Sequence, residues 1–135
     1  VVFGVVFGAA AGAVLAAGRA LRLPDGYETE VHLAARALVG SLGRILERGA
    51  LLFVDYGFPA HEYYHPQRSR GTLMCHYRHH AHADPLCLVG LQDITVHVDF
   101  STIAGAGAAA GLALLGYTTQ AHFLLATGLA EELAR

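Results

Sequence analysis

The sequence predicts an α/β protein, and two observations carry that prediction. The first is the order of the expected elements, which runs helix, strand, long loop, helix, strand, helix. The second is a continuous apolar run at residues 50–54, directly after a glycine that follows an amphipathic helix. Because this run does not alternate with polar residues, we expect a strand buried on both faces, as in a parallel sheet flanked by helices.

The clearest single element is a helix over roughly residues 28–48. Thr29 suits its N-cap, and Gly49 is placed to end it. The apolar side chains recur at helical spacing and form one stripe, which consists of Val31, Ala35, Leu38, Val39, Leu42, Ile45 and Leu46. This stripe predicts that the helix packs on the core along one face.

A long loop is expected next, because residues 57–92 carry three prolines and no sustained periodicity. A loop of this length inside a compact domain is more often functional than idle. Residues 94–100 alternate well enough for a short strand.

The last third of the chain predicts a helix, a strand and the start of another helix. Ser101 suits the cap of a helix that runs to about Leu115 and ends at Gly116. Residues 117–125 predict a strand, and residues 127–135 begin the final helix.

Composition narrows the function classes. With 135 residues the chain is at most one domain, and its formal net charge of −2 gives no electrostatic case for nucleic acid or an anionic membrane. Its two cysteines, Cys75 and Cys87, fit a reducing compartment better than a disulfide framework. A disulfide between Cys75 and Cys87 is the less favoured alternative.

Residues 1–18 contain no charged or polar side chain. Gly4, Gly8 and Gly12 recur at the spacing that lets membrane helices approach closely, and the segment is about as short as a membrane span can be. We favour a strand or hairpin followed by a small-residue segment, with a membrane span as the alternative. The chain starts without methionine, so we expect a piece of a longer protein.

Several potential metal ligands gather in the expected loop, namely Cys75, His76, His79, His80, His82 and Cys87. No pair of them has the spacing of a structural zinc site, and adjacent histidines point their rings apart. We therefore expect no metal, and solvated loop positions for His76 and His82.

Acid–base chemistry is the better interpretation of residues 93–97. In an extended segment Asp93, Thr95 and His97 share one face, which brings a carboxylate, a hydroxyl and an imidazole together. With His80 upstream, these side chains are candidates for proton transfer or substrate orientation. A polar strand face turned toward solvent is an equal alternative, and for Asp99 we favour helix capping.

Tyrosines and arginines accompany this segment and could line a groove for a polypeptide or a planar cation. They are Tyr56, Tyr63, Tyr64, Tyr77, Arg68, Arg70 and Arg78. Partial core filling explains about half of them equally well. Glu28 and Glu30 could pair with a substrate cation, although acidic residues are also expected in a first helical turn.

Five ordered blocks resemble the MidA family of S-adenosylmethionine-dependent methyltransferases, which includes the mitochondrial complex I assembly factor that methylates an arginine. The blocks are Tyr-Glu-Thr-Glu at 27–30, the stretch 49–57 ending in Asp-Tyr-Gly, Gly-Thr-Leu at 71–73 with Tyr77 and His80, the stretch 90–100, and the stretch 119–128. They cover roughly residues 27–129, whereas residues 1–26 match nothing in the family.

The resemblance implies a partial Rossmann-like class I methyltransferase sheet with helices on its faces and a long inserted loop. It implies S-adenosylmethionine as cofactor, a protein substrate and a bacterial cytoplasmic location, or the mitochondrial matrix in a eukaryote. The family's glycine-rich cofactor loop has no counterpart here, so we expect residues 1–135 to be the C-terminal part of one methyltransferase domain. The partner would be the N-terminal half of the same enzyme, and this chain would hold no cofactor-binding residues.

An arginine acceptor needs carboxylates to grip its guanidinium group. Among Glu30, Glu62, Asp84 and Asp93 we favour Asp93 as the catalytic carboxylate, with His80 and Thr95 orienting the acceptor or taking a proton. The expected substrate-binding residues are Glu30, Tyr56, Glu62, Tyr63, Arg68, Tyr77 and His97. The alternatives are a non-catalytic binding or assembly module, membrane-associated through residues 1–18, and then a metal-binding hydrolase.

Overall fold

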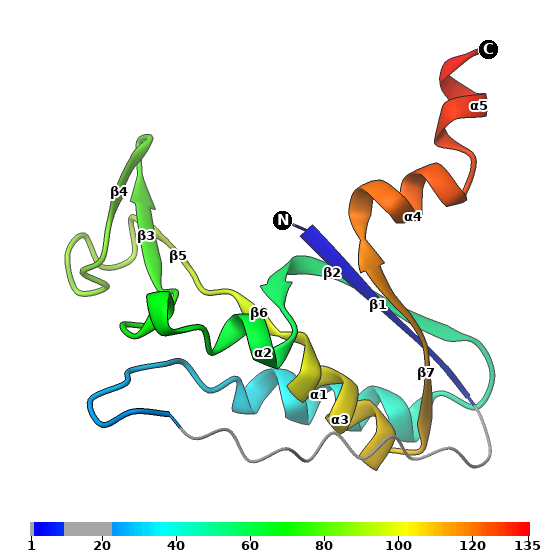
Figure 1. The fold of residues 1–135 in the computed structure, drawn as a ribbon, viewed down its shortest axis with the longest axis horizontal. Helices are drawn as coiled ribbons and strands as arrows, with labels where there is room; N and C mark the ends of the chain where they lie inside the picture. Colours follow the sequence, from blue (N-terminus) through cyan, green and yellow to red (C-terminus); the bar gives the residue numbers. More distant parts are fainter. Residues whose placement is uncertain (1, 10–22) are drawn as a thin grey trace.

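The structure is a computed structural model that describes residues 2–9 and 23–135, with side chains from residue 23 onward. It contains a four-stranded sheet with helices packed against it and a separate three-stranded sheet that stands apart from α1 and α3 (Figure 1). The expected α/β class is therefore confirmed. Among the described residues, no helix is long and apolar enough to cross a membrane.

The four-stranded sheet has the order β6-β2-β1-β7. Its strands are β1 (Val2–Ala9), β2 (Ala50–Phe58), β6 (Val98–Asp99) and β7 (Leu112–Thr119). Strand β1 lies antiparallel to both β2 and β7. The only parallel pairing in the described sheet joins β2 to β6, where Gly57 lies opposite Val98 and Phe58 opposite Asp99. The favoured strand within residues 1–18 is present as β1, and residues 10–18 lie outside the described part.

Helices α1 (Leu33–Ile45) and α3 (Phe100–Ala109) cover one face of this sheet (Figure 1). The buried core between them consists of Val39, Phe100, Ile103 and Leu112, with Leu51 and Phe53 of β2 packed against it. The two helices approach closely at Gly43, where an added Cβ would lie 2.7 Å from the Ala110 side chain.

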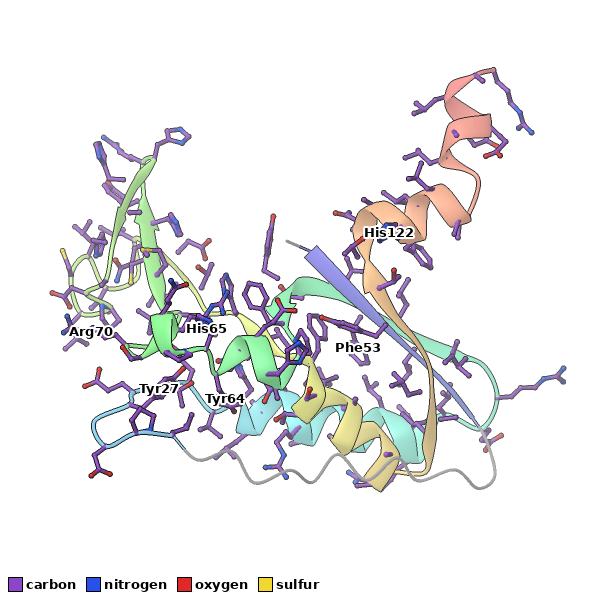
Figure 2. The ribbon with its side chains drawn as sticks, viewed as in Figure 1. Tyr27, Phe53, Tyr64, His65, Arg70 and His122 are labelled. Atoms are coloured by element: carbon purple, nitrogen blue, oxygen red, sulfur yellow. The ribbon has the colours of Figure 1, made fainter. Side chains whose placement is uncertain are left out.

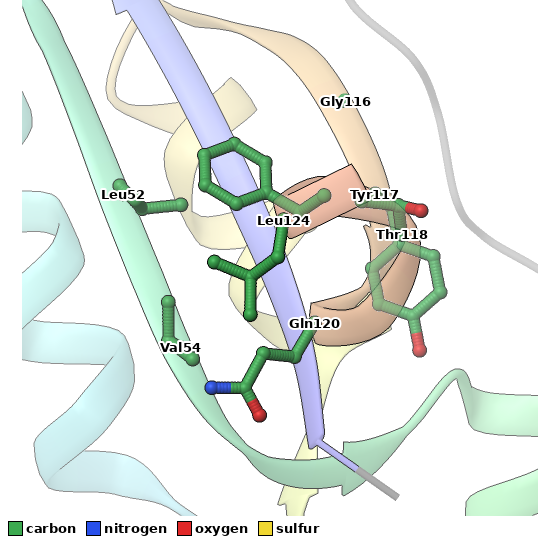
Figure 3. Close-up of a pocket in the computed structure, with 8 residues that line it drawn as sticks. Leu52, Val54, Gly116, Tyr117, Thr118, Gln120 and Leu124 are labelled. Atoms are coloured by element: carbon green, nitrogen blue, oxygen red, sulfur yellow. The ribbon is translucent and has the colours of Figure 1, made fainter. Parts of the chain in front are cut away.

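The opposite face of β2 is open, which corrects the prediction of a strand buried on both faces. Leu52 and Val54 are 48% and 50% exposed, while Leu51 and Phe53 on the other face are partly buried. Helix α4 (Gln120–Ala126) lies near this open face and encloses an apolar pocket of about 270 Å³ with it. Figure 3 shows Leu124 of α4 facing Leu52 and Val54 across β1. Helix α5 (Leu129–Leu133) follows α4.

The helix expected over 28–48 is shorter at both ends. It begins at Leu33, and its N-cap residue His32 makes no side-chain capping bond, so Thr29 is not the cap. It ends at Ile45, and Gly49, with φ of 135°, belongs to the turn that enters β2.

The second helix and the strand after it also begin and end earlier than expected. Asp99, rather than Ser101, caps α3, because its carboxylate accepts the backbone N–H groups of Ser101 and Thr102. The helix ends at Ala109, and Gly111 in a left-handed conformation (φ 81°) turns the chain into β7. The expected strand at 117–125 is wrong beyond Thr119, which caps α4.

The expected loop at 57–92 contains more regular structure than predicted. It holds α2 (Ala60–Tyr63), a 3₁₀ turn (Pro66–Arg68), β3 (Met74–Tyr77) and β4 (His80–His82). Together with β5 (Asp93–Thr95) these strands form the small sheet, in the order β4-β3-β5. Arg78 and His79 both have positive φ, as a two-residue type I′ hairpin turn requires.

Candidate functional site

An open groove of about 1060 Å³ lies between the end of β2, strand β3 and the segment from β5 to β6. Five of the residues expected at the site line it, namely Tyr56, Arg68, Asp93, Thr95 and His97. The groove therefore combines a carboxylate, a hydroxyl, an imidazole, an aromatic ring and one guanidinium. The apolar pocket beside α4 contains none of the expected site residues.

Strand β5 presents the carboxylate and the hydroxyl. Asp93 is opposite His76 in the pairing of β5 with β3, and its side chain is exposed. Thr95 is also exposed, and its hydroxyl donates to the Met74 carbonyl at 3.2 Å. Because β3 holds β5 from one side only, these side chains sit at the edge of the small sheet where a ligand can reach them.

Thr72 and Phe58 contact the backbone and the ring of His97, respectively. Its backbone N–H donates to the Thr72 hydroxyl oxygen at 2.9 Å, and its ring meets the edge of Phe58 with centroids 5.1 Å apart. The Arg68 guanidinium lies 4.1 Å from the centre of the same Phe58 ring. Burial, and then the charge of Arg68, lower the pKa of His97, so the neutral imidazole is favoured near neutrality.

The Nδ1 atom of His97 is buried and has no hydrogen-bond partner within residues 23–135. Buried polar atoms are nearly always paired, so an orphan beside a groove calls for an explanation. The backbone of His97 is fixed, whereas its ring is left with unused hydrogen-bonding capacity.

Glu30 anchors the loop that carries Thr72. Its Oε1 accepts the backbone N–H groups of Thr72 and Leu73, both at 2.8 Å. Its Oε2 accepts the hydroxyls of Thr72 at 3.1 Å and Tyr63 at 3.2 Å. Burial alone would raise the pKa of Glu30, but the bonds from Thr72 and Leu73 outweigh it and the pKa is lowered. Gly71, with φ of 76°, leaves room for this carboxylate.

Two residues expected to bind substrate therefore belong to the scaffold instead. Both oxygens of Glu30 are engaged by the protein itself, so this carboxylate is not offered to a cation. Tyr63 is only 1% exposed, and its hydroxyl lies 3.3 Å from His32 Nε2. Burial, and then the nearby Glu30 charge, raise the pKa of Tyr63 to about 12.

Three further candidates do not line the groove. Glu62 lies exposed on α2, 3.5 Å from its neighbour His61. Tyr77 and His80 pair with each other at the hairpin turn between β3 and β4. The structure thus separates His80 from Asp93 and Thr95, with which it was expected to act.

Polar contacts tie the residues that follow α2 to Tyr27 on one side and to the N-terminus of α3 on the other. The Tyr27 hydroxyl donates to the His65 carbonyl at 3.1 Å, and the Tyr64 hydroxyl donates to Asp99 Oδ2 at 3.2 Å. Figure 2 shows Tyr27, Tyr64 and His65 gathered below the small sheet. Burial, and then the Asp99 charge, raise the pKa of Tyr64 to about 12. The cap predicted for Asp99 is confirmed, and its carboxylate also serves this junction.

Sequence reasoning missed three groove residues, which are His32, Asp55 and His76. A signal existed for Asp55, because it stands in Asp-Tyr-Gly directly after the apolar run, where a strand ends. Nothing in the sequence pointed to His32, since it was placed inside a helix.

No three or more His, Cys, Asp or Glu side chains of the described part are arranged to hold a metal ion. Cys75 is buried and Cys87 is exposed, and both are free thiols.

The sequence of residues 9–118 matches the family described as "Putative S-adenosyl-L-methionine-dependent methyltransferase". The chain belongs to this family, so the expected methyltransferase class is confirmed at that level, while the narrower MidA assignment stays a prediction. No curated protein matches the chain significantly.

Two solved structures share the fold. An uncharacterised protein from Burkholderia thailandensis is 60% identical over 83% of this chain, with a TM-score of 0.80. A member of the same superfamily from Burkholderia thailandensis, bound to S-adenosyl-homocysteine, is 46% identical over 97% of this chain, also with a TM-score of 0.80. This chain spans only 30% and 40% of those two proteins, respectively.

Proposed function

We propose that this protein is an S-adenosylmethionine-dependent methyltransferase and that the described groove receives the methyl acceptor. The observation that carries the proposal is the match over 97% of the chain to a solved relative that binds S-adenosyl-homocysteine. That molecule is the product left when S-adenosylmethionine gives up its methyl group. The family to which residues 9–118 belong supports the same reaction class.

The groove suits the reactive, cationic end of the cofactor and a cationic acceptor. Asp55, Asp93 and the Tyr56 ring all line it and attract positive charge. When bound, the cofactor supplies a methyl group on a sulfonium, which an acceptor nitrogen attacks in line. The contribution of the chain is to align that nitrogen and to exclude water from it.

The methionine and ribose groups of the cofactor have fewer suitable binding groups in this chain. The sequence contains no G-x-G-x-x-G loop. The first N–H groups of α3 are already bound to Asp99, so they are not free to cradle a carboxylate. Because the solved relatives are much longer, we propose that another part of the whole protein holds the methionine and ribose groups.

For the acceptor we propose the guanidinium of an arginine in a protein substrate, and a cytoplasmic or mitochondrial-matrix location follows from the family resemblance. Asp93 is exposed at the groove edge, where it could hold a guanidinium through charge-assisted hydrogen bonds. Thr95 and Tyr56 would orient the acceptor beside it, and the open shape of the groove admits an extended polypeptide.

The test is methyl transfer by the full-length protein to arginine-containing peptides, with the modified residue identified by mass spectrometry. Asp93→Asn should lower acceptor-dependent transfer about ten- to a hundredfold. The neutral amide cannot form the charge-assisted hydrogen bonds that the carboxylate makes with a guanidinium, which contribute roughly 1.5–3 kcal/mol. Cofactor affinity, measured by titration with S-adenosyl-homocysteine, should change little.

Asp25→Asn is the matched control, since Asp25 is exposed in a turn and does not line the groove. Equal loss in both variants, or methylation confined to residues other than arginine, would contradict the assigned acceptor. A melting temperature several degrees lower for Asp93→Asn with normal turnover would make Asp93 a structural residue.

A further inference from the structure

We propose that His97 is the proton acceptor of this groove and that Glu30 positions it through Thr72. The proposal rests on the proposed function and adds a residue role to it. Its starting point is geometric, because His97 lines the groove while its Nδ1 is buried without a partner in the described part.

Methylation of a guanidinium nitrogen replaces one of its hydrogens by a methyl group, so the site must accept the proton that is released. A bond forms between the acceptor nitrogen and the methyl carbon, and the bond from that carbon to sulfur breaks, leaving a neutral thioether. The methylated nitrogen then carries one proton more than it does in the product, which is a methylated guanidinium cation. That proton passes to the imidazole of His97 and from there to solvent. No oxidant or reductant is needed.

Among the groove side chains, His97 is the best suited to this task. Burial and the Arg68 charge keep its imidazole neutral near neutrality, so it is available as a base. The other titratable or charged groups that line the groove are His32, Asp55, Tyr56, Arg68, His76 and Asp93. Only His97 combines a fixed backbone with an unpaired buried ring nitrogen.

Glu30 fixes the backbone that carries this imidazole. Its carboxylate holds Thr72 through the backbone N–H and the hydroxyl, and the Thr72 hydroxyl oxygen accepts the N–H of His97. The same carboxylate accepts the Tyr63 hydroxyl, which lies beside His32 at the groove. A hydrogen-bonded chain thus runs beneath the groove from one histidine to the other, with Glu30 at its centre.

The first experiment is the pH dependence of methyl transfer by the full-length protein. The wild-type rate should fall with decreasing pH, and this acid limb of the pH–rate profile should have its midpoint below about 6.5, the ordinary pKa of histidine. His97→Gln should abolish the limb and lower the plateau by about a hundredfold, as loss of a general base does. Arg68→Gln should move the limb to higher pH, because it removes the cation that depresses the pKa of His97.

The controls separate His97 from its neighbours. His61→Gln changes an exposed histidine on α2 that does not line the groove and should keep both rate and limb. His32→Gln and His76→Gln should keep the limb. Glu30→Gln should lower the plateau and move the limb to lower pH, because the Glu30 charge raises the pKa of His97. A limb that survives in His97→Gln and vanishes in His32→Gln or His76→Gln would overturn the proposal.

A second readout is independent of turnover. The ring Cε1–H resonance of His97, identified as the signal missing from His97→Gln, should titrate below about 6.5 in wild type and higher in Arg68→Gln. A His97 ring that titrates at the ordinary value in both proteins would overturn the proposal while leaving the proposed function intact. Absence of any methyl transfer by wild type, with normal His97 titration, would overturn the proposed function and the catalytic role with it.

Discussion

At the level of single residues, the carboxylate of Glu30 determines the local path of the backbone. It accepts two backbone N–H groups and two hydroxyls, three of these four donors lying 42 or 43 positions along the chain. These long-range bonds engage Glu30 in a segment that lies outside α1, although its sequence favours a helical turn. A pattern that reports only local spacing could not have found them.

Glu30→Gln should destabilise the chain by about 1.5–3 kcal/mol at neutral pH, because charge-assisted hydrogen bonds become neutral ones. The folded-state pKa of Glu30 is lowered, so its contribution is present above the unfolded value, about 4.3, and is lost as pH falls through the folded value. Urea unfolding should therefore show a gap between wild type and Glu30→Gln that closes in acid.

Glu28→Gln is the natural comparison, since Glu28 is exposed and lies two residues away. If the difference in unfolding free energy between wild type and Glu30→Gln stayed constant down to strongly acidic pH, the loss of stability would not come from the charge of Glu30.

At the level of elements, Asp-Tyr-Gly marks the place where β2 meets β6. An added Cβ on Gly57 would collide with the Val98 backbone and lie 2.9 Å from the Phe100 ring. The glycine is therefore required by the close approach of two strands, which explains part of a motif that the sequence suggested only by resemblance. It also fixes the residues of β6 that lead into the cap of α3.

Gly57→Ala should cost about 1–3 kcal/mol of folding free energy, as overpacking of a core site does. Gly116→Ala is the control, because a Cβ there meets nothing within 4 Å. Thermal or urea unfolding of both variants measures the difference. Equal stability of the two would mean that β2 and β6 separate at little cost.

The sequence predicted the existence of the main elements better than their extents. The helix α1 was found because helical periodicity is a local property, but its predicted stripe was right only in part. Val39 is buried, and Ala35 and Leu46 pack against the core. The prediction is wrong for Val31, Leu38 and Ile45, which are exposed. The boundary between α3 and β7 was misplaced because a run of Ala, Gly and Leu suits helix and strand alike, and Gly111 decides it. The strands of the small sheet are three or four residues long, too short for a period of two to stand out.

The candidate site was predicted in part for the same reason. Asp93, Thr95 and His97 are close in sequence, and all three line the groove. Glu30 and Tyr63 were chosen for their chemistry alone, and only tertiary packing shows that they lie beneath it.

At the level of the whole molecule, the described helices cover the two faces of the large sheet unequally. Helices α1 and α3 pack on one face, while Leu52 and Val54 remain half exposed on the other. The groove lies at the junction of the large and small sheets, and the sequence contains no G-x-G-x-x-G motif. We therefore expect this chain to bind the methyl acceptor and another part of the whole protein to bind most of the cofactor.

The 135-residue chain alone should bind S-adenosylmethionine weakly or not at all. Backbone amides at a glycine-rich turn normally hold the charged and ribose ends of such a cofactor, and the sequence contains no G-x-G-x-x-G motif for such a turn. Calorimetric titration of the chain is the measurement. Micromolar affinity would show that its own residues suffice.

Helix α5 should exchange its amide hydrogens with deuterium quickly. It is five residues long, follows Gly128 in a left-handed conformation, and contains no buried residue. Its hydrogen bonds are thus opened by fraying and not by unfolding of the core. In deuterated buffer the α5 amides should be replaced at nearly the rate of an unfolded peptide, while those around Val39 stay protected far longer.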